Sequence, residues 1–284
     1  MSLGFGFGLQ YSKLSGGGSG FEGFLNQFPG ASLGLSLRLL DINYTGSAIK
    51  VRRSSNNDEL DIGFVNNELD TASLLDFVGS GNGFVSIWYD QSGQNLDVSQ
   101  NLASAQPQIV NSGSLILEDN KPSISFNGTS QFLSTSSSFS ATNIYISSVV
   151  NAANASQNER IYHVKNSGNN IAMIRAVDYP SQLLLFRNLT NNTEFNGPIS
   201  FKSLINRLYT SINSDTLFED SELSNGKDSG ITSYNGSNGI FIGCRADEGS
   251  FANIKAQEFI FYNFDNSSNR VGIENNVNSR YNLY

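Results

Sequence analysis

Short runs rich in Val, Ile, Tyr and Phe, separated by clusters of Asn, Ser and Gly, make up most of the chain after Pro107. β-branched and aromatic residues favour strands, and the polar clusters are typical of turns. The predicted strands cover residues 114–117, 123–126, 143–150, 159–164, 171–176, 182–186, 207–212, 239–243 and 254–262. Many short strands joined by polar turns predict an all-β sandwich or barrel.

The segment before Pro107 combines strands with one short helix. Asp70 has the chemistry of an N-cap for a helix over 71–78, with Gly79 near its end. Residues 31–41 are apolar enough for a buried helix or a buried strand, and their periodicity does not decide between them. The predicted strands are 48–53, 60–64 and 84–89, the first two joined by a polar hairpin loop over 54–59.

The two ends of the chain predict different structures. Residues 1–9 alternate large apolar residues with Gly, which indicates a strand without a second face, and 15–20 form a flexible Gly/Ser linker. We expect residues 1–20 to form an extended N-terminal arm that supplies strand hydrogen bonds to another subunit; a disordered terminus is the alternative. Residues 266–284 predict a short closing helix, one face of which would carry Arg270, Ile273, Val277 and Tyr281.

Composition narrows the classes of function. The 284 residues carry Lys+Arg 17 against Asp+Glu 25, a net charge of −8, so nucleic acid is not expected as a partner. Cys244 is the only cysteine and His163 the only histidine, which leaves no intrachain disulfide and no zinc site built on Cys and His. The sequence has no apolar run of about 18 residues for a membrane span and no recognisable secretory signal. We expect no cofactor.

Two blocks of sequence carry a resemblance to a known family. The first comprises Leu37-Arg38-Leu39-Leu40, Tyr44-Thr45-Gly46 and Val51-Arg52-Arg53-Ser54-Ser55; the second is Trp88-Tyr89-Asp90-Gln91-Ser92-Gly93, followed by Asp97 and Gln100. Weaker similarity occurs at Gly243 and Asp247 and in Ala256-Gln257-Glu258-Phe259-Ile260-Phe261-Tyr262. Together they resemble the catalytic domain of the fungal α-L-arabinofuranosidase B family. The resemblance implies a concanavalin A-like jelly-roll β-sandwich over 21–284, in two portions, 21–105 and 106–284.

The resemblance also implies where catalysis would have to take place. A retaining glycosidase needs two carboxylates about 5 Å apart, one as nucleophile and one as acid/base. In the family the nucleophilic Glu follows a strand that here corresponds to 161–164, and no Asp or Glu occurs between Arg160 and Asp178. Asp247 matches the acid/base position, and an ordinary loop carboxylate is the alternative. One carboxylate cannot run the double displacement, so we expect no arabinofuranosidase activity.

A second resemblance indicates a structural role. Residues 115–128 look like the opening strands of laminin-G-like modules, and the first block is similar to modules of bacteriophage tail and head-appendage proteins. This implies a non-enzymatic virion protein that contacts other virion proteins through its arm, forms a homo-oligomer and takes host glycan as a ligand. The alternative is a secreted, extracellular glycan-binding protein or a diverged arabinofuranosidase.

Two small sets of residues are candidate binding sites. Tyr234, Asn235 and Asn238 place an aromatic ring beside amides in a loop, which suits sugar hydroxyls, with a plain turn as the alternative. Asp90, Asn95 and Asp97 carry the hard oxygen atoms that calcium takes. Their spacing does not match an EF-hand loop, so an Asx turn is favoured over a metal site.

The predicted strands also indicate the partners of two arginines and the direction in which two aromatic residues face. Arg52 and Arg53 lie in an acidic protein, and we expect them to pair with carboxylates across the hairpin, with an anion site as the alternative. The available carboxylates are Asp58, Glu59 and Asp61. Trp88 and Tyr89 are adjacent in one strand, so one of them must face the core.

Overall fold

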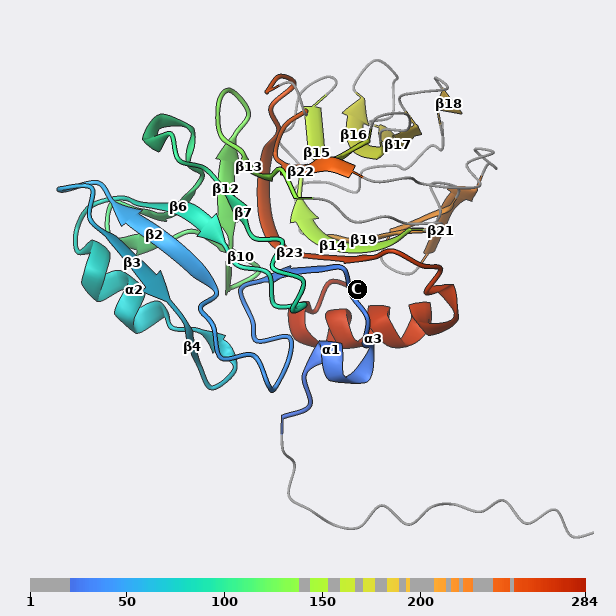
Figure 1. The fold of residues 1–284 in the computed structure, drawn as a ribbon, viewed down its shortest axis with the longest axis horizontal. Coiled ribbons are helices and arrows are strands. Elements are labelled where there is room, and N and C mark those ends of the chain that lie inside the picture. The colour runs from blue at the N-terminus through green and yellow to red at the C-terminus, as the bar shows by residue number, and fades with distance from the viewer. Residues whose placement is uncertain are drawn as a thin grey trace, which may run out of the picture.

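The computed structural model describes residues 21–137, 144–152, 159–166, 171–176, 183–188, 193–194, 207–212, 216–219, 222–226, 237–245 and 248–284 (Figure 1). The predicted arm, 1–20, lies outside these residues. So do three of the candidate site residues, Tyr234, Asn235 and Asp247.

Nineteen of the described strands belong to one continuous sheet, which folds over into two layers. The first layer is built on β23 (Asn253–Tyr262), with β1 (Leu33–Ser36) and β12 (Ile124–Asn127) along one side and β14 (Tyr145–Asn151) along the other. Beyond β14 the layer continues through β19 (Arg207–Ile212), β20 (Thr216–Glu219) and β21 (Glu222–Gly226). All these pairings are antiparallel.

The second layer faces the first and has a longer run of paired strands. In spatial order it contains β18 (Thr193–Glu194), β17 (Leu183–Asn188), β16 (Ile171–Ala176), β15 (Glu159–Asn166), β22 (Ser237–Ile242), β13 (Leu133–Thr135), β7 (Val98–Ser99), β6 (Gly83–Trp88), β2 (Ile49–Arg53) and β3 (Glu59–Ile62). At one edge β8 (Gln108–Asn111) pairs with β6, β9 (Ser114–Leu115) and β12, which joins the two layers. Two separate hairpins, β4–β5 (Phe64–Val65, Glu68–Leu69) and β10–β11 (Leu117–Glu118, Lys121–Pro122), extend from this framework.

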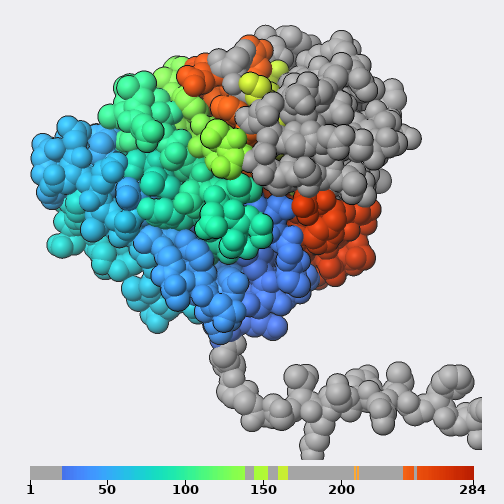
Figure 2. Space-filling model, in the orientation of Figure 1, coloured from blue at the N-terminus to red at the C-terminus, as the bar shows by residue number. Residues whose placement is uncertain are grey.

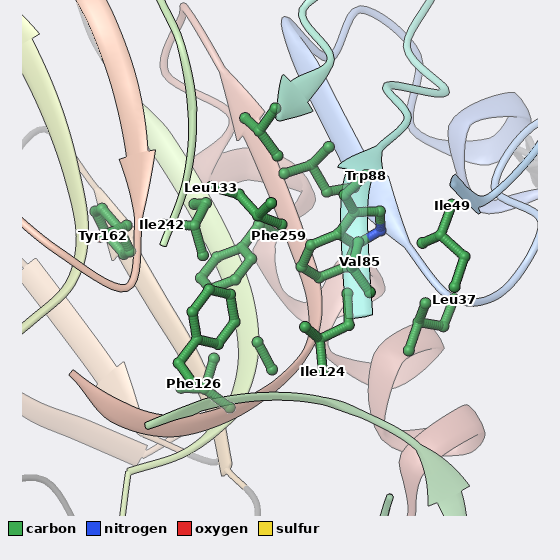
Figure 3. Packing of buried hydrophobic residues seen from close by; sticks show 14 of the residues in the cluster. Leu37, Ile49, Val85, Trp88, Ile124, Phe126, Leu133, Tyr162, Ile242 and Phe259 are labelled. Carbon is green, nitrogen blue, oxygen red and sulfur yellow. The ribbon is translucent and has the colours of Figure 1, made fainter. Parts of the chain in front are cut away.

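The main core lies between the two layers and is centred on aromatic rings (Figure 3). Trp88 from β6 and Tyr162 from β15 approach Phe259 of β23 edge-on, with ring centroids 6.0 and 6.1 Å apart. All three side chains are fully buried. Burying one large apolar side chain contributes about 1.5–3 kcal/mol, so these contacts hold the layers together.

Two helices cover the opposite face of the first layer (Figure 1). They are α1 (Phe24–Gln27) and α3 (Arg270–Tyr281), the second preceded by a 3-10 turn at Ser267–Asn269. Ile273, Val277 and Tyr281 of α3 are buried in a second core with Tyr145 and Tyr262 of the sheet. The predicted closing helix and its apolar face are therefore confirmed.

The short internal helix is also confirmed. It is α2 (Thr71–Val78), and the Asp70 side chain accepts a hydrogen bond from the Ser73 amide at 3.0 Å, as an N-cap does. Gly79 ends the helix at a φ of 64°, where a residue without a Cβ is favoured. The buried Leu74 and Val78 pack into the main core.

The sequence left one element open and placed others imprecisely. Residues 31–41 contain a strand, β1, because its backbone pairs with β23. The predicted strand 114–117 is divided into β9 and β10, because Ile116 hydrogen-bonds instead to Ile109 and Ser123. The all-β sandwich is confirmed, and among the described residues no helix is long and apolar enough to cross a membrane.

Candidate functional site

The second sequence block forms a hydrogen-bonded clamp around the carboxylate of Asp90. One oxygen, Oδ1, accepts from the amides of Gly34 and Ser92 at 2.8 and 2.9 Å. The other, Oδ2, accepts from the Ser92 hydroxyl at 2.8 Å and the Leu96 amide at 3.0 Å. Asp90 is 4% exposed, so its charge is held by protein donors, which is the Asx-type arrangement that the spacing favoured.

The other calcium candidates also have structural surroundings. Asp97 Oδ1 accepts from the Asp90 amide at 2.8 Å. Asn95 is an exposed loop residue with a φ of 58°, a conformation that Asn tolerates better than most residues. Within the part of the chain that the structure describes, no group of three or more His, Cys, Asp or Glu side chains is arranged to hold a metal ion.

Gln91 ties the two sequence blocks together. Its side-chain oxygen accepts from the Leu40 amide at 2.7 Å, and its nitrogen donates to the carbonyls of Ser36 and Arg38 at 3.1 and 3.0 Å. The side chain is 1% exposed. A buried amide that satisfies three backbone groups fixes the path of the chain after β1.

The first block and the last strand meet in a buried ion pair. Arg38 Nε and Nη2 donate to the two carboxylate oxygens of Glu258, at 2.7 and 3.0 Å. Ser36 Oγ donates to the same carboxylate at 2.8 Å, and Arg38 Nη1 donates to Asn276 of α3 at 3.0 Å. Glu258 is 1% exposed. A carboxylate that accepts this many donors is committed to structure rather than to a substrate.

The protonation of this cluster follows from its burial and charges. Burial alone would lower the pKa of Arg38, but the Glu258 carboxylate outweighs it and raises the pKa above the ordinary value. Burial, followed by the charge of Glu258, raises the pKa of Tyr281. The Tyr281 hydroxyl is therefore protonated and donates to Glu258 Oε2 at 3.2 Å, so α3 is linked to the ion pair.

The strand that corresponds to the nucleophile segment is β15. Its described side chains Tyr162 and Val164 belong to the core, and His163 is buried, with its ring centroid 6.4 Å from that of Phe241. The one carboxylate of this strand is Glu159, at its first position, where Oε2 accepts from the Asn253 amide at 2.8 Å. Glu159 was not among the predicted site residues, because it precedes the segment that the resemblance marked.

The loop that contains the acid/base candidate lies against the same end of β15. The Arg160 amide donates to the carbonyl of Ser250 at 3.0 Å, and the Gly243 amide donates to Ile161 at 2.9 Å. These bonds place the described residues 243–245 and 248–250 beside the start of β15, and Asp247 lies outside the described residues. Buried Glu159 is therefore close to the described residues that flank Asp247 in the sequence.

The remaining predictions have mixed outcomes. Asn238 lies in β22 rather than in a loop, at a β-bulge where the pairing passes from Gly239 to Ser237. Trp88 faces the core as one of the pair had to, while Tyr89 is partly exposed and donates to Asp61 at 2.6 Å.

The arginines of the hairpin also differ from each other. Arg53 pairs with Asp58, as predicted. Arg52 instead donates to the side-chain oxygens of Gln106 and Asn57, at 2.7 and 2.8 Å, and its guanidinium lies 4.8 Å from the Phe84 ring centroid. The prediction of a carboxylate partner is wrong for Arg52, because the amide of Gln106 and the ring of Phe84 occupy its guanidinium.

Known structures share this fold. No protein-family model and no curated protein sequence matches the chain. A mutant GH54 α-L-arabinofuranosidase soaked with 4-nitrophenyl α-L-arabinofuranoside matches with a TM-score of 0.68 and 12% sequence identity. An arabinofuranosidase in complex with arabinofuranosyl-α-1,2-xylobiose matches with a TM-score of 0.65 and the same identity.

The matches cover most of this chain but only part of the arabinofuranosidases. In both, 87% of this chain is aligned with 62% of the other chain, so this chain spans less than two thirds of the length of those arabinofuranosidases. At 12% identity the likeness shows the fold alone. The class of protein that the strands and core define is a concanavalin A-like β-sandwich structurally similar to GH54 α-L-arabinofuranosidases.

Proposed function

We propose that this protein binds glycan without hydrolysing arabinofuranosides. The observation that carries the proposal is the combination of a GH54-like sandwich with a β15 strand whose only carboxylate, Glu159, bonds to the backbone of Asn253. The arabinofuranosidases with this fold have been crystallised with an aryl arabinofuranoside and an arabinofuranosyl-xylobiose. A scaffold of this kind can display a sugar-binding surface on its loops independently of catalysis.

The requirements of a retaining glycosidase support the proposal that this protein does not hydrolyse arabinofuranosides. The double displacement needs a nucleophile and an acid/base about 5 Å apart. The segment from Ile161 to Val177 contains no Asp or Glu, so neither β15 after its first residue nor β16 offers a nucleophile. An acid at Asp247 would find no nucleophilic carboxylate in this segment.

A second candidate function is a structural role in a virion, and the observation that favours it is the sequence of residues 1–20. A Gly-interrupted apolar segment before a Gly/Ser linker suits an arm that pairs with another virion protein. The resemblance of the first block to phage appendage modules supports the same role, with homo-oligomers providing avidity for host glycan. Of the two roles, the fold comparison favours an extracellular glycan-binding protein over a virion protein.

The experiment is a pair of measurements on the full chain. We expect binding to at least one glycan on an array of plant, bacterial and animal oligosaccharides, and no release of 4-nitrophenol from 4-nitrophenyl α-L-arabinofuranoside above the buffer rate. Turnover that disappears in Asp247→Asn would show a working glycosidase. A chain that binds no glycan, and that is found in purified virus particles, would leave the structural role alone.

A further inference from the structure

An open depression of about 400 Å³ lies between residues 44–47 and the β4–β5 hairpin. We propose that this depression binds a neutral saccharide and holds one or two sugar residues at the end of a glycan chain. The inference rests on the proposed glycan binding, to which it adds a location and a class of ligand. In Figure 1 the β4 label lies below β3 and away from β22, and residues 39–67 belong to the blue, N-terminal part of Figure 2.

An aromatic pair forms one part of the lining. The rings of Tyr44 and Phe64 meet edge-on, with centroids 6.4 Å apart and planes at 75°. The Tyr44 hydroxyl donates to the Ser47 carbonyl at 2.9 Å, which fixes the ring. Both rings are only partly buried, so each keeps apolar surface that the C–H face of a sugar ring can cover.

Polar side chains without protein partners form the rest. Thr45, Ser47, Asn66 and Asn67 line the depression. Among the described residues, no hydrogen bond is formed by the hydroxyls of Thr45 and Ser47 or by the side-chain amides of Asn66 and Asn67, although the Asn67 carbonyl accepts from the Leu39 amide at 2.9 Å. Hydroxyls and amides both donate and accept, which is the capacity needed to bind sugar hydroxyls.

The two amides are carried by a tight turn of defined geometry. Val65 pairs with Glu68, so Asn66 and Asn67 form a two-residue hairpin loop, with φ values of 52° and 66°. Two successive positive φ values define a type I′ turn, which matches the twist of the strands. The turn therefore sets the backbone positions of Asn66 and Asn67 before a ligand arrives, which lowers the backbone part of the entropy cost of binding.

The charge around the depression selects a neutral ligand. No Asp, Glu, Lys or Arg lines it, so an acidic sugar would find no cation to pair with its carboxylate. Burial first, and then the negative charges of the Asp97 and Asp90 carboxylates, raise the pKa of Tyr44 to about 12. The field at the ring thus disfavours sialic and uronic acids.

The size of the depression sets the expected strength. Small-molecule sites typically measure about 300–1,000 Å³, and this one is at the lower end and open to solvent. An open site that contacts one or two sugar residues binds weakly, so useful affinity requires several copies of the site. A terminal sugar fits this geometry better than the interior of a polymer.

A matched pair of turn variants tests the proposal on the full chain. The β10–β11 hairpin has the same kind of turn, with Asp119 and Asn120 at φ values of 46° and 61°, and Asn120 is exposed. Asn67→Gly and Asn120→Gly each place Gly at the second turn position, where it is favoured, and only the first removes an amide from the depression. Tyr44→Ala removes the ring, with circular dichroism and a thermal melt as the check on folding.

The readout is binding to an array of neutral oligosaccharides and their sialylated counterparts, followed by titration of the tightest neutral glycan. We expect Asn67→Gly to weaken binding about fivefold and Tyr44→Ala about tenfold or more, and Asn120→Gly to bind like the wild type.

Each other outcome has a defined meaning. If the wild type binds neutral glycan and Asn67→Gly matches Asn120→Gly, the sugar binds elsewhere: this inference is overturned and the proposed function stands. Binding confined to sialylated glycans overturns it in the same way. If the wild type binds no glycan, the proposed function fails together with the inference.

Discussion

Around Arg38, polar side chains turn inward and bond to protein; around Tyr44, hydroxyls and amides line an open depression and have no hydrogen-bond partner among the described residues. Both regions lie between residues 36 and 67, in the N-terminal part of the sandwich. The contrast shows that polar residues close together in the sequence can serve the fold at one place and remain available to a ligand at another. Residues that sequence similarity marks must be sorted by their partners before they are assigned a function.

The largest expected effect is in the buried ion pair. Arg38→Ala would leave the Glu258 carboxylate buried without its bidentate partner, and breaking such a pair costs about 3–5 kcal/mol. The measurement is the free energy of unfolding in urea. Arg53→Ala, which removes the partly exposed partner of Asp58, is the control and should lose far less stability.

The double variant Arg38→Met with Glu258→Leu tests the interpretation. It removes both charges and keeps apolar volume, so it should recover much of the loss. If Arg38→Ala is no more harmful than Arg53→Ala, the ion pair does not hold α3 and the last strand to the first block, and the contrast between the two regions is lost.

The next effect is at the clamp. Asp90→Ala removes the acceptor for three backbone amides and a hydroxyl, and leaves buried donors unsatisfied at about 1–3 kcal/mol each. We expect the free energy of unfolding to fall by at least about 3 kcal/mol, the sum for the three amides at the low end of that range. Asp61→Ala, which removes an exposed acceptor of the Tyr89 hydroxyl, should have a smaller effect.

Adding calcium tests whether the Asp90 carboxylate is only a structural clamp or also a calcium ligand. If its carboxylate serves only as a clamp, calcium chloride should leave the wild-type melting temperature unchanged. A rise with calcium that Asp90→Ala abolishes would support the metal site that Asp90, Asn95 and Asp97 suggested by composition.

How far the sequence could predict this molecule depends on whether a contact is local. The helix over 71–78 was predictable because its cap, Asp70, and its terminator, Gly79, lie next to it. The strand at 33–36 was not, since pairing with β23, far along the chain, decides it. The depression could not be predicted either, because only the folded hairpin brings Asn67 beside Tyr44.

A smaller effect, on glycan binding, is expected from a substitution in the depression. A Cβ at Gly46 would lie 2.5 Å from the Tyr44 hydroxyl oxygen, whereas a Cβ at Gly63 would meet nothing within 4 Å. Gly46→Ala should therefore displace the Tyr44 ring and weaken glycan binding several-fold, with little change in the melting temperature. Gly63→Ala, in the same lining, is the matched control. Equal binding by both variants would mean that the ring position is irrelevant to the ligand.

The smallest effect on stability concerns Asp97, which accepts a hydrogen bond from the Asp90 amide and whose charge acts on Tyr44 at the depression. Burial first, and then the Asp90 carboxylate, raise the pKa of Asp97 above its ordinary 3.8. A raised carboxyl pKa means that the folded state holds the proton more tightly than the unfolded state, so the ionised group opposes folding at neutral pH. Asp97→Asn keeps an oxygen for the Asp90 amide and should be more stable than the wild type at pH 7.

The sign of the pH dependence makes this test sharp. The stability advantage of Asp97→Asn should shrink as the pH falls through the raised folded pKa, and it should vanish below the unfolded value, where the wild-type carboxyl is protonated in both states.

Asp41 provides the opposite case: although burial alone would raise its pKa, hydrogen bonds from Asn43 and Asn26 lower the pKa below 3.8. Asp41→Asn should therefore destabilise at pH 7 and lose that effect on acidification through the lowered folded pKa. Urea midpoints of both variants between neutral and acidic pH measure the two signs, and parallel profiles would show that Asp97 is not linked electrostatically to the buried clamp.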